Sequence, residues 1–254
     1  MTKPVAILQH ETNQGPGVLL DHLQHQDIPY QIICPPADGT APHDARAYRG
    51  IIILGSNHGV NEQLAWMQSE RALLQSAIAS DIPVLGHCFG AQMLAHAMGA
   101  KVSRNACPNI GWSQIWVTPD AQHDLQIPAH TMMFNWHYDT FEIPRGATRT
   151  MYGTYCLNKG FRHGRNWAFQ GHFEVTAQSL EAWCKEGRHE LLCASGPSCQ
   201  CEKQILEHLP ARINALHAVA RRVYGAWTRQ LDRTTSSITT LPRRRTEACD
   251  WVLN

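Results

Sequence analysis

Residues 82–98 read IPVLGHCFGAQMLAHAM, a stretch that predicts a strand, a sharp turn and a helix in immediate succession. The turn carries Cys88, with Gly86 two residues before it and Gly90 two residues after it. A turn of this small-x-nucleophile-x-small type is a nucleophile elbow, in which a strained backbone raises one reactive side chain above the edge of a sheet. A free cysteine can instead be a small buried hydrophobe at the end of a core strand. The flanking glycines and the following helix favour the elbow, and they make Cys88 the candidate nucleophile.

The position of Cys88 also suits the chemistry of a thiol. Only the thiolate is a strong nucleophile, and the N-terminus of a helix stabilises an anion through its unpaired N–H groups and its dipole. The N–H of Phe89 would face the oxyanion that develops when a thiolate attacks a carbonyl carbon. We therefore expect nucleophilic catalysis at this turn.

A candidate partner for Cys88 lies far downstream. Residues 167–174 read WAFQGHFE, an apolar run that leads to His172 and Glu174. Because side chains alternate along a strand, His172 and Glu174 share one face, where the carboxylate can orient and polarise the imidazole. In a chain with 15 histidines, a lone His-x-Glu is more often a solvated strand end. Both segments would end at the carboxyl edge of one parallel sheet, however, and together they predict a Cys-His-Glu site.

The rest of the chain alternates between strand-like and helix-like patterns. Apolar runs predict strands over 4–9, 30–33 and 50–54, and a helical stripe formed by Leu64, Met67, Ala72, Leu74 and Ile78 follows them. Such βαβ alternation predicts a mainly parallel sheet. From Gly111 to Gln170 turn signals separate short strands, which indicates an antiparallel or mixed extension. Closing helices are predicted over 176–187 and 204–224, and a mobile tail over 227–254.

Further segments share a characteristic order and spacing with the elbow, and they are IIILGSN at 51–57, PVLGHCFGAQ at 83–92, GW at 111–112, WHYDTF at 136–141, NKGF at 158–161 and QGHFE at 170–174. With these segments the chain resembles a class I glutamine amidotransferase domain of the free-standing type, similar to the amidotransferase part of GMP synthase. The resemblance covers residues 3–224. It implies one domain over 1–226, with a flavodoxin-like α/β fold whose open, mainly parallel sheet is flanked by helices.

The resemblance implies roles for individual residues. Cys88 would be the nucleophile, His172 the acid and base, and Glu174 the partner that orients His172. The oxyanion hole would use Phe89 and the loop at Gly55 and Ser56. The substrate-binding residues that it implies are Gln92, Asn158, Gly160, Phe161, His137 and Asp139. His137 and Asp139 are also compatible with a strand end whose polar groups bond locally.

Three departures from the family pattern bear on substrate and rate. The family commonly has Gly-Gly-Pro where this chain has Gly-Ser-Asn at 55–57, and it usually has proline where this chain has Phe173. Lys159 stands where a glutamine is often found. A residue with a Cβ at position 56 can still donate its N–H, but a backbone flip there is costlier than with glycine.

The resemblance implies release of ammonia from glutamine, or of an amine from a γ-glutamyl compound, through a γ-glutamyl thioester on Cys88. No metal or organic cofactor is implied. The partner would be a small-molecule substrate, with a separate ammonia-accepting synthetase as a further candidate. Two alternatives stay open, which are a cysteine hydrolase of the DJ-1/PfpI group and a catalytically weak regulatory subunit.

Composition narrows the class of protein. A chain of 254 residues with 43% hydrophobic content can build a large α/β core, and a net charge of +1 favours neither nucleic acid nor a membrane surface as partner. No apolar run approaches the ~20 residues that span a bilayer. Nine cysteines without a signal peptide predict a reducing, cytoplasmic location. The cluster of Cys193, Cys199 and Cys201 lacks paired zinc-ligand spacing and is interpreted as a loop with surface thiols.

Overall fold

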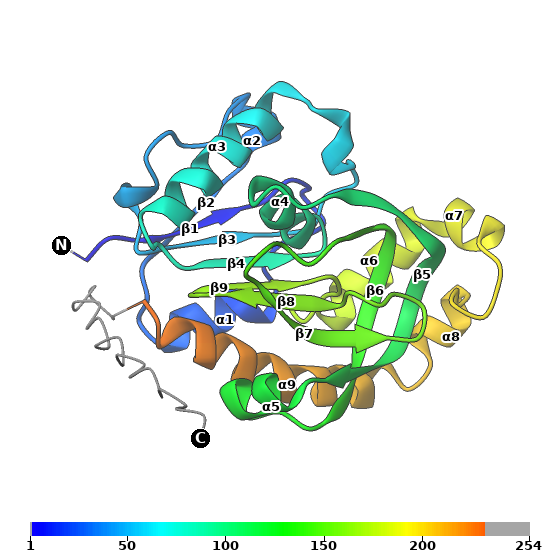
Figure 1. Ribbon diagram of the computed structural model, residues 1–254. Coiled ribbons are helices and arrows are strands. Elements are labelled where there is room, and N and C mark those ends of the chain that lie inside the picture. The colour runs from blue at the N-terminus through cyan, green and yellow to red at the C-terminus, as the bar shows by residue number, and fades with distance from the viewer. Residues whose placement is uncertain (1, 232–254) are drawn as a thin grey trace, which may run out of the picture.

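The half of the sheet that carries Cys88 is parallel. The computed structural model describes residues 2–231 of the chain, and its single nine-stranded sheet begins with the strand order β2-β1-β3-β4-β9 (Figure 1). All neighbouring pairs in this order are parallel, and the strands are β1 (Val5–Leu8), β2 (Tyr30–Ile33), β3 (Gly50–Ile53), β4 (Val84–His87) and β9 (Asn166–Phe169). These strands match the runs predicted from the sequence.

The other half of the sheet is antiparallel. It continues from β9 in the order β8-β7-β5-β6, with β5 (Val102–Val117), β6 (His130–Phe141), β7 (Thr148–Gly153) and β8 (Gly160–His163). This extension begins at Val102 rather than at Gly111, and β5 and β6 are long rather than short. The register of β5 shifts between Arg104 and Asn109, and Gly111 has a positive φ of 104°. These irregularities interrupt the alternation along the strand, which is why its first part escaped the sequence pattern.

Helices cover both faces of the sheet. Helices α1 (Val18–His25) and α9 (Leu209–Thr228) lie on one face, and α3 (Ala65–Ala79) and α4 (Phe89–Ala97) lie on the other (Figure 1). Side chains of the parallel strands alternate between the two cores that result. The remaining helical segments are α2 (Pro35–Asp38), α5 (Pro119–Leu125), α6 (Ala177–Glu186), α7 (Arg188–Cys193), α8 (Glu202–Leu206) and the 3₁₀ turns η1 (Ala45–Ala47) and η2 (Val60–Glu62).

The C-terminal helices differ from their predicted bounds. The segment 204–224 belongs to two helices because His208, in the left-handed conformation, and Pro210, in the first turn of α9, separate α8 from α9. Helix α9 continues to Thr228, and Trp227 is fully buried. The prediction of a mobile tail from residue 227 is therefore wrong for residues 227–231, because Trp227 and Leu231 pack against Gly50 of β3. Residues 232–254, where the rest of the predicted tail falls, lie outside the described residues.

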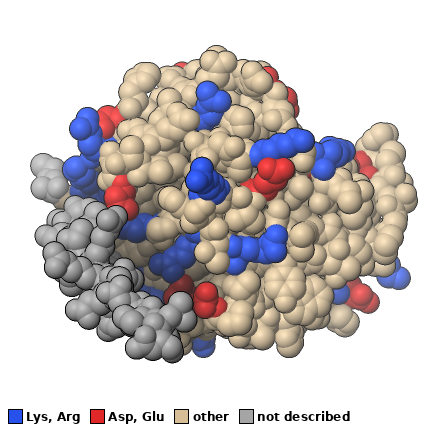
Figure 2. Space-filling model, viewed as in Figure 1, with Lys and Arg blue, Asp and Glu red and all other residues tan. Residues whose placement is uncertain are grey.

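The surface seen in Figure 2 carries charges of both signs. Lys and Arg side chains and Asp and Glu side chains lie there in small groups, separated by broad areas of other residues. Within residues 2–231, no helix combines the length and the apolar character needed to cross a membrane.

Candidate active site

Cys88 occupies a strained turn at the carboxyl end of β4. Its backbone has φ 50° and ψ −108°, and it is the N-cap residue of α4. The turn is tight enough that a Cβ on Gly86 would lie 2.6 Å from the carbonyl group of Gly90, and one on Gly90 would overlap the carbonyl of Ile53 in β3. Only glycine fits at both positions, so the predicted elbow forms for the steric reason that its spacing suggested.

Replacing Gly90 by alanine is expected to destabilise the protein by about 3 kcal/mol or more, because backbone atoms of β3 and α4 must separate to admit the methyl group. Urea unfolding followed by circular dichroism measures the loss. Gly15→Ala is the matched control, since a Cβ there would meet its nearest atoms at 3.9 Å. Equal stabilities of the two variants would contradict the steric account of the elbow.

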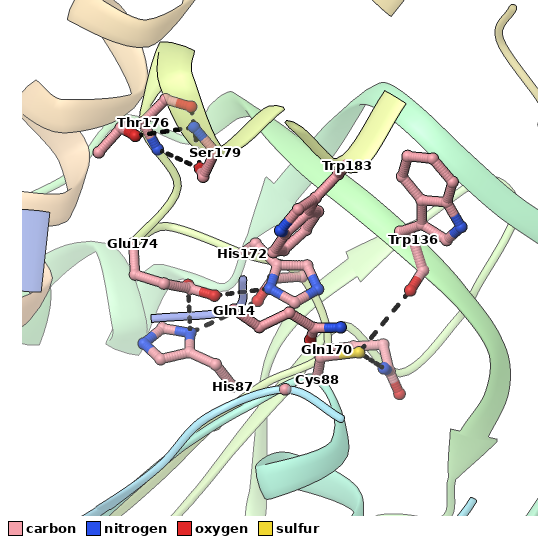
Figure 3. Close-up of polar contacts among 12 residues, drawn as sticks. Gln14, His87, Cys88, Trp136, Gln170, His172, Glu174, Thr176, Ser179 and Trp183 are labelled. Atoms are coloured by element: carbon pink, nitrogen blue, oxygen red, sulfur yellow. Dashed lines mark hydrogen bonds and ion pairs between the residues drawn. The ribbon is translucent and has the colours of Figure 1, made fainter. Parts of the chain in front are cut away.

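The structure brings Cys88, His172 and Glu174 together (Figure 3). His172 and Glu174 follow β9, the parallel neighbour of β4, and the Cys88 N–H donates to the carbonyl of Phe169 at 2.8 Å. His172 Nδ1 lies 2.6 Å from Glu174 Oε1, and the side chains of His172 and Cys88 face the same cavity. The Trp183 ring stands edge-on to the imidazole at 5.0 Å. A carboxylate, an imidazole and a sulfur therefore follow one another in a largely buried series.

Electrostatics favour a charged imidazole at the centre of this series. Burial opposes the charge, but the charges of Glu174 and Cys88 and hydrogen bonds to both outweigh it and raise the pKa of His172 to about 10. Burial likewise opposes ionisation of Glu174, whereas His172 and His87 hold the pKa of its carboxyl below the usual value. At neutral pH the site thus presents an imidazolium beside a carboxylate.

A second histidine, His87, contacts the carboxylate of Glu174. His87 Nδ1 lies 3.5 Å from Glu174 Oε2 and 3.4 Å from the carbonyl oxygen of Gly171, and its Nε2 lies 3.4 Å from the hydroxyl of Tyr224 in α9. Burial lowers the pKa of His87, so its neutral ring can donate one N–H toward the carboxylate. His87 was not among the predicted site residues. The feature that could have marked it is a polar residue in the last position of a fully buried strand.

The loop after β3 runs beside the imidazole. A Cβ on Gly55 would lie only 3.2 Å from His172 Cε1. The carbonyl oxygen of Gly55 accepts a hydrogen bond from His10 Nδ1 at 3.0 Å, and His10 Nε2 lies 2.9 Å from Glu70 Oε2 in a fully buried pair. Because the C=O and N–H of one peptide group point in opposite directions, this anchor sets the direction of the Ser56 N–H.

Phe89 is the first residue of α4. Its N–H has no carbonyl to bind within the helix, as at every helix N-terminus. The ring of Phe89 is buried against His10 and Trp66, which holds this end of the helix in place. The residues predicted for the oxyanion hole therefore lie on either side of Cys88.

Cys88 lies between two cavities. The His172 cavity has a volume of about 260 Å³ and is lined by Asn13, Gln14, Ser56, Asn57, Cys88, Trp136, His172, Trp183, Glu186, Gly187 and Glu190. The Gln92 cavity has a volume of about 620 Å³ and is lined by Ser56, Asn57, His58, Gly59, Asn61, Glu62, Cys88, Phe89, Gln92, Arg104, Trp136, His137, Tyr138, Asp139 and Glu190. A substrate amide at the sulfur would have room for groups on both of its sides.

Three of the predicted substrate-binding residues line the Gln92 cavity. Gln92 Nε2 donates to the carbonyl of Asp139 at 3.2 Å and to Gln170 Oε1 at 3.3 Å. His137 Nδ1 lies 2.9 Å from the same Asp139 carbonyl. The local hydrogen bond of His137 thus lies in the wall of the cavity. A strand end with locally bonded polar groups is therefore compatible with a predicted role in binding substrate.

Asn158, Gly160 and Phe161 line neither cavity. Asn158 accepts from Arg149 Nε at 2.9 Å and donates to the carbonyl of Phe141 at 2.7 Å, while Phe161 is fully buried against the Phe141 ring. Their role in binding substrate stays a prediction. Gly160 and Phe161 lie in β8, an interior strand paired with β7 and β9, and both residues are buried there, whereas Asn158 lies half-buried in the loop before β8.

Three residues beside Cys88 or in its cavity wall were not among the predicted site residues, namely Gln170, Trp183 and Glu190. Gln170 Nε2 donates to Cys88 Sγ at 3.8 Å, although only its place in the QGHFE segment had been noted. Trp183 and Glu190 come from α6 and α7, and Glu190 Oε1 accepts from Trp136 Nε1 at 2.9 Å. No local pattern marks these helices as part of a site.

Comparison with known proteins agrees with this geometry. The sequence profile described as "Glutamine amidotransferase class-I" matches residues 18–184, more than half of the chain. The chain belongs to the class I glutamine amidotransferase family. The crystal structure of a glutamine amido transferase from Methylobacillus flagellatus is 33% identical, with a TM-score of 0.88 and coverage of 93% of this chain and 98% of that one. The predicted family and the flavodoxin-like α/β fold are both confirmed.

Curated relatives of this amidotransferase family differ in what they are named for. A GMP synthase from Bacillus velezensis is 31% identical over 132 residues, which are 50% of this chain and 24% of the synthase. Gamma-glutamyl peptidase 4 from Arabidopsis thaliana is 29% identical over 126 residues, 46% of this chain and 50% of the peptidase. The chain thus spans about half or less of these relatives.

The clustered cysteines Cys193, Cys199 and Cys201 line neither of the two cavities at Cys88. Cys193 and Cys201 are exposed, Cys199 is half-buried, and all three are free thiols. Among the residues that the structure describes, no three His, Cys, Asp or Glu side chains are grouped so as to hold a metal ion.

Proposed function

We propose that this protein hydrolyses γ-glutamyl amide bonds with Cys88 as nucleophile, His172 as general acid and base, and Glu174 as the group that orients His172. The observation that carries the proposal is the buried His172–Glu174 pair, which faces one cavity together with Cys88, a residue that also lines a second cavity. Membership of the class I glutamine amidotransferase family supports this interpretation over a DJ-1/PfpI-type hydrolase.

The proposed reaction has two stages, acylation of Cys88 and hydrolysis of the thioester. The Cys88 thiolate adds to the amide carbon, and the resulting oxyanion lies between the N–H groups of Phe89 and Ser56. His172 gives its proton to the amide nitrogen, the C–N bond breaks, and the amine leaves with a γ-glutamyl thioester on Cys88. His172 then takes a proton from water, whose oxygen attacks the thioester and releases glutamate and the thiolate. No cofactor is needed for these steps.

The two cavities would receive different parts of the substrate. The general acid must reach the leaving nitrogen, and His172 lines the smaller cavity but not the Gln92 cavity. The leaving amine therefore belongs in the His172 cavity and the glutamyl group in the Gln92 cavity. There, Arg104 and the carboxylates of Asp139 and Glu62 offer both charges needed for an α-carboxylate and an α-ammonium group.

The His172 cavity indicates the class of leaving group. Ammonia from glutamine would fill little of its 260 Å³, whereas a substituted amine would occupy it. Its charged side chains other than His172 are Glu186 and Glu190, and two indole rings, Trp136 and Trp183, complete its wall. Carboxylates and indole faces attract cations. We therefore propose γ-glutamyl conjugates of cationic amines as the preferred substrates.

Kinetics with four substrates test this proposal. Glutamine is compared with γ-glutamyl conjugates of a diamine, of a neutral alkylamine and of alanine, whose leaving groups are cationic, neutral and anionic. We expect kcat/KM to be about tenfold higher for the diamine conjugate than for the alanine conjugate. The Glu190→Gln variant should show a smaller ratio, because removing a charge close to the bound amine removes about 1 kcal/mol or more of attraction.

Exposed Glu207 supplies the control variant Glu207→Gln, which should leave the ratio unchanged. A higher kcat/KM for the anionic conjugate would contradict the assignment of the His172 cavity. Preference for glutamine would favour the second candidate, an amidotransferase that passes ammonia to a separate synthetase; the relative from Bacillus velezensis is named a glutamine-hydrolyzing GMP synthase.

A further inference from the structure

Lys159 is a buried cation close to the site. It lies in the loop before β8 with its side chain fully buried, and its Nζ donates to Asn135 Oδ1 at 2.6 Å. Nζ also lies 2.8 Å from His137 Nε2, while His137 Nδ1 lies 2.9 Å from the Asp139 carbonyl. Burial and the charge of Lys159 hold the pKa of His137 well below its usual value, so a neutral His137 accepts from the ammonium and donates to the carbonyl.

No carboxylate neutralises this ammonium group within residues 2–231. Both of its hydrogen-bond partners are uncharged, and the cysteines whose charged forms would act on it are Cys156, Cys88 and Cys107. A buried charge without a counter-ion is strongly unfavourable and persists only where something offsets it. Of the three thiols, Cys88 is the one proposed to react as a thiolate.

Several contacts connect Lys159 to the sulfur of Cys88. The Gln170 N–H donates to the Lys159 carbonyl at 2.9 Å, and Gln170 Nε2 donates to Cys88 Sγ at 3.8 Å (Figure 3). On the other side, Cys88 Sγ donates to the carbonyl of Trp136 at 3.8 Å, and Trp136 precedes His137 in β6. The ammonium group is therefore held by two residues of β6, Asn135 and His137, of which His137 lines the Gln92 cavity together with Cys88.

We propose that Lys159 is a positioning residue whose buried positive charge favours the thiolate form of Cys88. The proposal rests on Cys88 being the nucleophile of the proposed function. In the family pattern a glutamine often stands at this position, and a neutral amide would form similar hydrogen bonds without the charge. Together with the His172 imidazolium, Lys159 would place a second cation near the sulfur.

The effect of Lys159 depends on pH in a defined direction. Burial lowers the pKa of Lys159 to about 8, and the charges of Cys156, Cys88 and Cys107 act against that shift. His137, the other ionisable group that faces the ammonium, stays neutral. Below about pH 8 Lys159 is therefore charged and supports the thiolate, and above this pH its support is lost.

Alkylation of Cys88 by iodoacetamide tests the proposal without any substrate. The rate is followed from pH 5.5 to 10 by mass spectrometry of the peptide that contains Cys88, in the wild type, in Lys159→Met and in Lys159→Gln. We expect both variants to react about tenfold more slowly at pH 6 to 7, because a nearby unit charge at an effective dielectric constant of about 20 has an effect of this order. The rates should converge above about pH 9, where wild-type Lys159 is neutral.

The half-buried Cys34 provides an internal control, since its alkylation should be the same in all three proteins. Circular dichroism and thermal unfolding establish that at least one variant is folded, and Lys159→Arg, which keeps the charge, should recover most of the wild-type rate. Identical Cys88 profiles in the wild type and the folded variants would overturn the proposal. An alkylation rate of Cys88 that is lower by the same factor at every pH would also overturn the proposal, because it would indicate altered packing. If alkylation responds as expected while no amide is hydrolysed, the proposed function fails and the role of Lys159 stands.

Discussion

Cys88→Ala is expected to lose amide hydrolysis by about 10⁴-fold or more, because no other group in the series can form the acyl intermediate. The wild type incubated with a γ-glutamyl amide and quenched in acid should carry a γ-glutamyl group on Cys88, detectable by mass, and the variant should carry none. Labelling by diazo-oxo-norleucine, an electrophile that mimics glutamine, should likewise require Cys88.

Two controls separate chemistry from folding in this experiment. Cys34→Ala removes a half-buried thiol outside both cavities and should leave kcat/KM unchanged. Cys88→Gly should be about 1 kcal/mol more stable than Cys88→Ala, because glycine relieves the strain at φ 50°. Residual turnover in Cys88→Ala near the wild-type rate would rule out the thioester mechanism, and absence of labelling in the wild type would favour a regulatory subunit.

His172→Ala is expected to lower kcat by about 10³-fold to 10⁴-fold, and Glu174→Gln by a smaller factor, because Glu174 acts only through the imidazole. The His172 side chain pairs with Glu174 and faces the same cavity as Cys88, so its removal leaves the leaving nitrogen without a proton donor and Glu174 without its main partner. Single-turnover kinetics with a chromogenic γ-glutamyl anilide measure acylation directly. Wild-type acylation in His172→Ala would contradict its role as the acid.

The same pair gives a pH dependence of stability whose sign can be derived. The pKa of His172 is raised from 6.5 to about 10, so its contribution to stability is complete below pH 6.5 and is lost as the pH rises through 10. The pKa of Glu174 is lowered from 4.5, so its contribution is present above that value and is lost in more acidic solution. Urea unfolding from pH 4 to 10 should therefore show greatest stability between these limits. Glu174→Gln should weaken the dependence of stability on pH at both the acidic and the alkaline end. An unchanged dependence would contradict the electrostatic coupling of His172 and Glu174.

The sequence predicted the parts of the site that depend on local geometry. Gly86 and Gly90 are required by contacts inside the elbow itself, and the His-x-Glu spacing places His172 and Glu174 on one side of the segment after β9. Asn158 and Phe161 show the limit of carrying a motif across from a family. Their residue types matched, but neither lines a cavity at Cys88, because Phe161 is buried in β8 inside the antiparallel half of the sheet and Asn158 bonds to Arg149 and to the Phe141 carbonyl.

The amino-acid sequence by itself determined the class of this protein, because alternating apolar runs, paired glycines around a cysteine and short motifs are all properties of neighbouring residues. Only the tertiary structure decided which distant groups meet at the sulfur. The parallel pairing of β4 with β9 brings His172 to Cys88, the long β5–β6 hairpin places His137 on Lys159, and α6 and α7 supply Trp183 and Glu190 to the cavity wall. These contacts depend on strand order and helix packing across more than 20 residues of chain, and no local spacing specifies them.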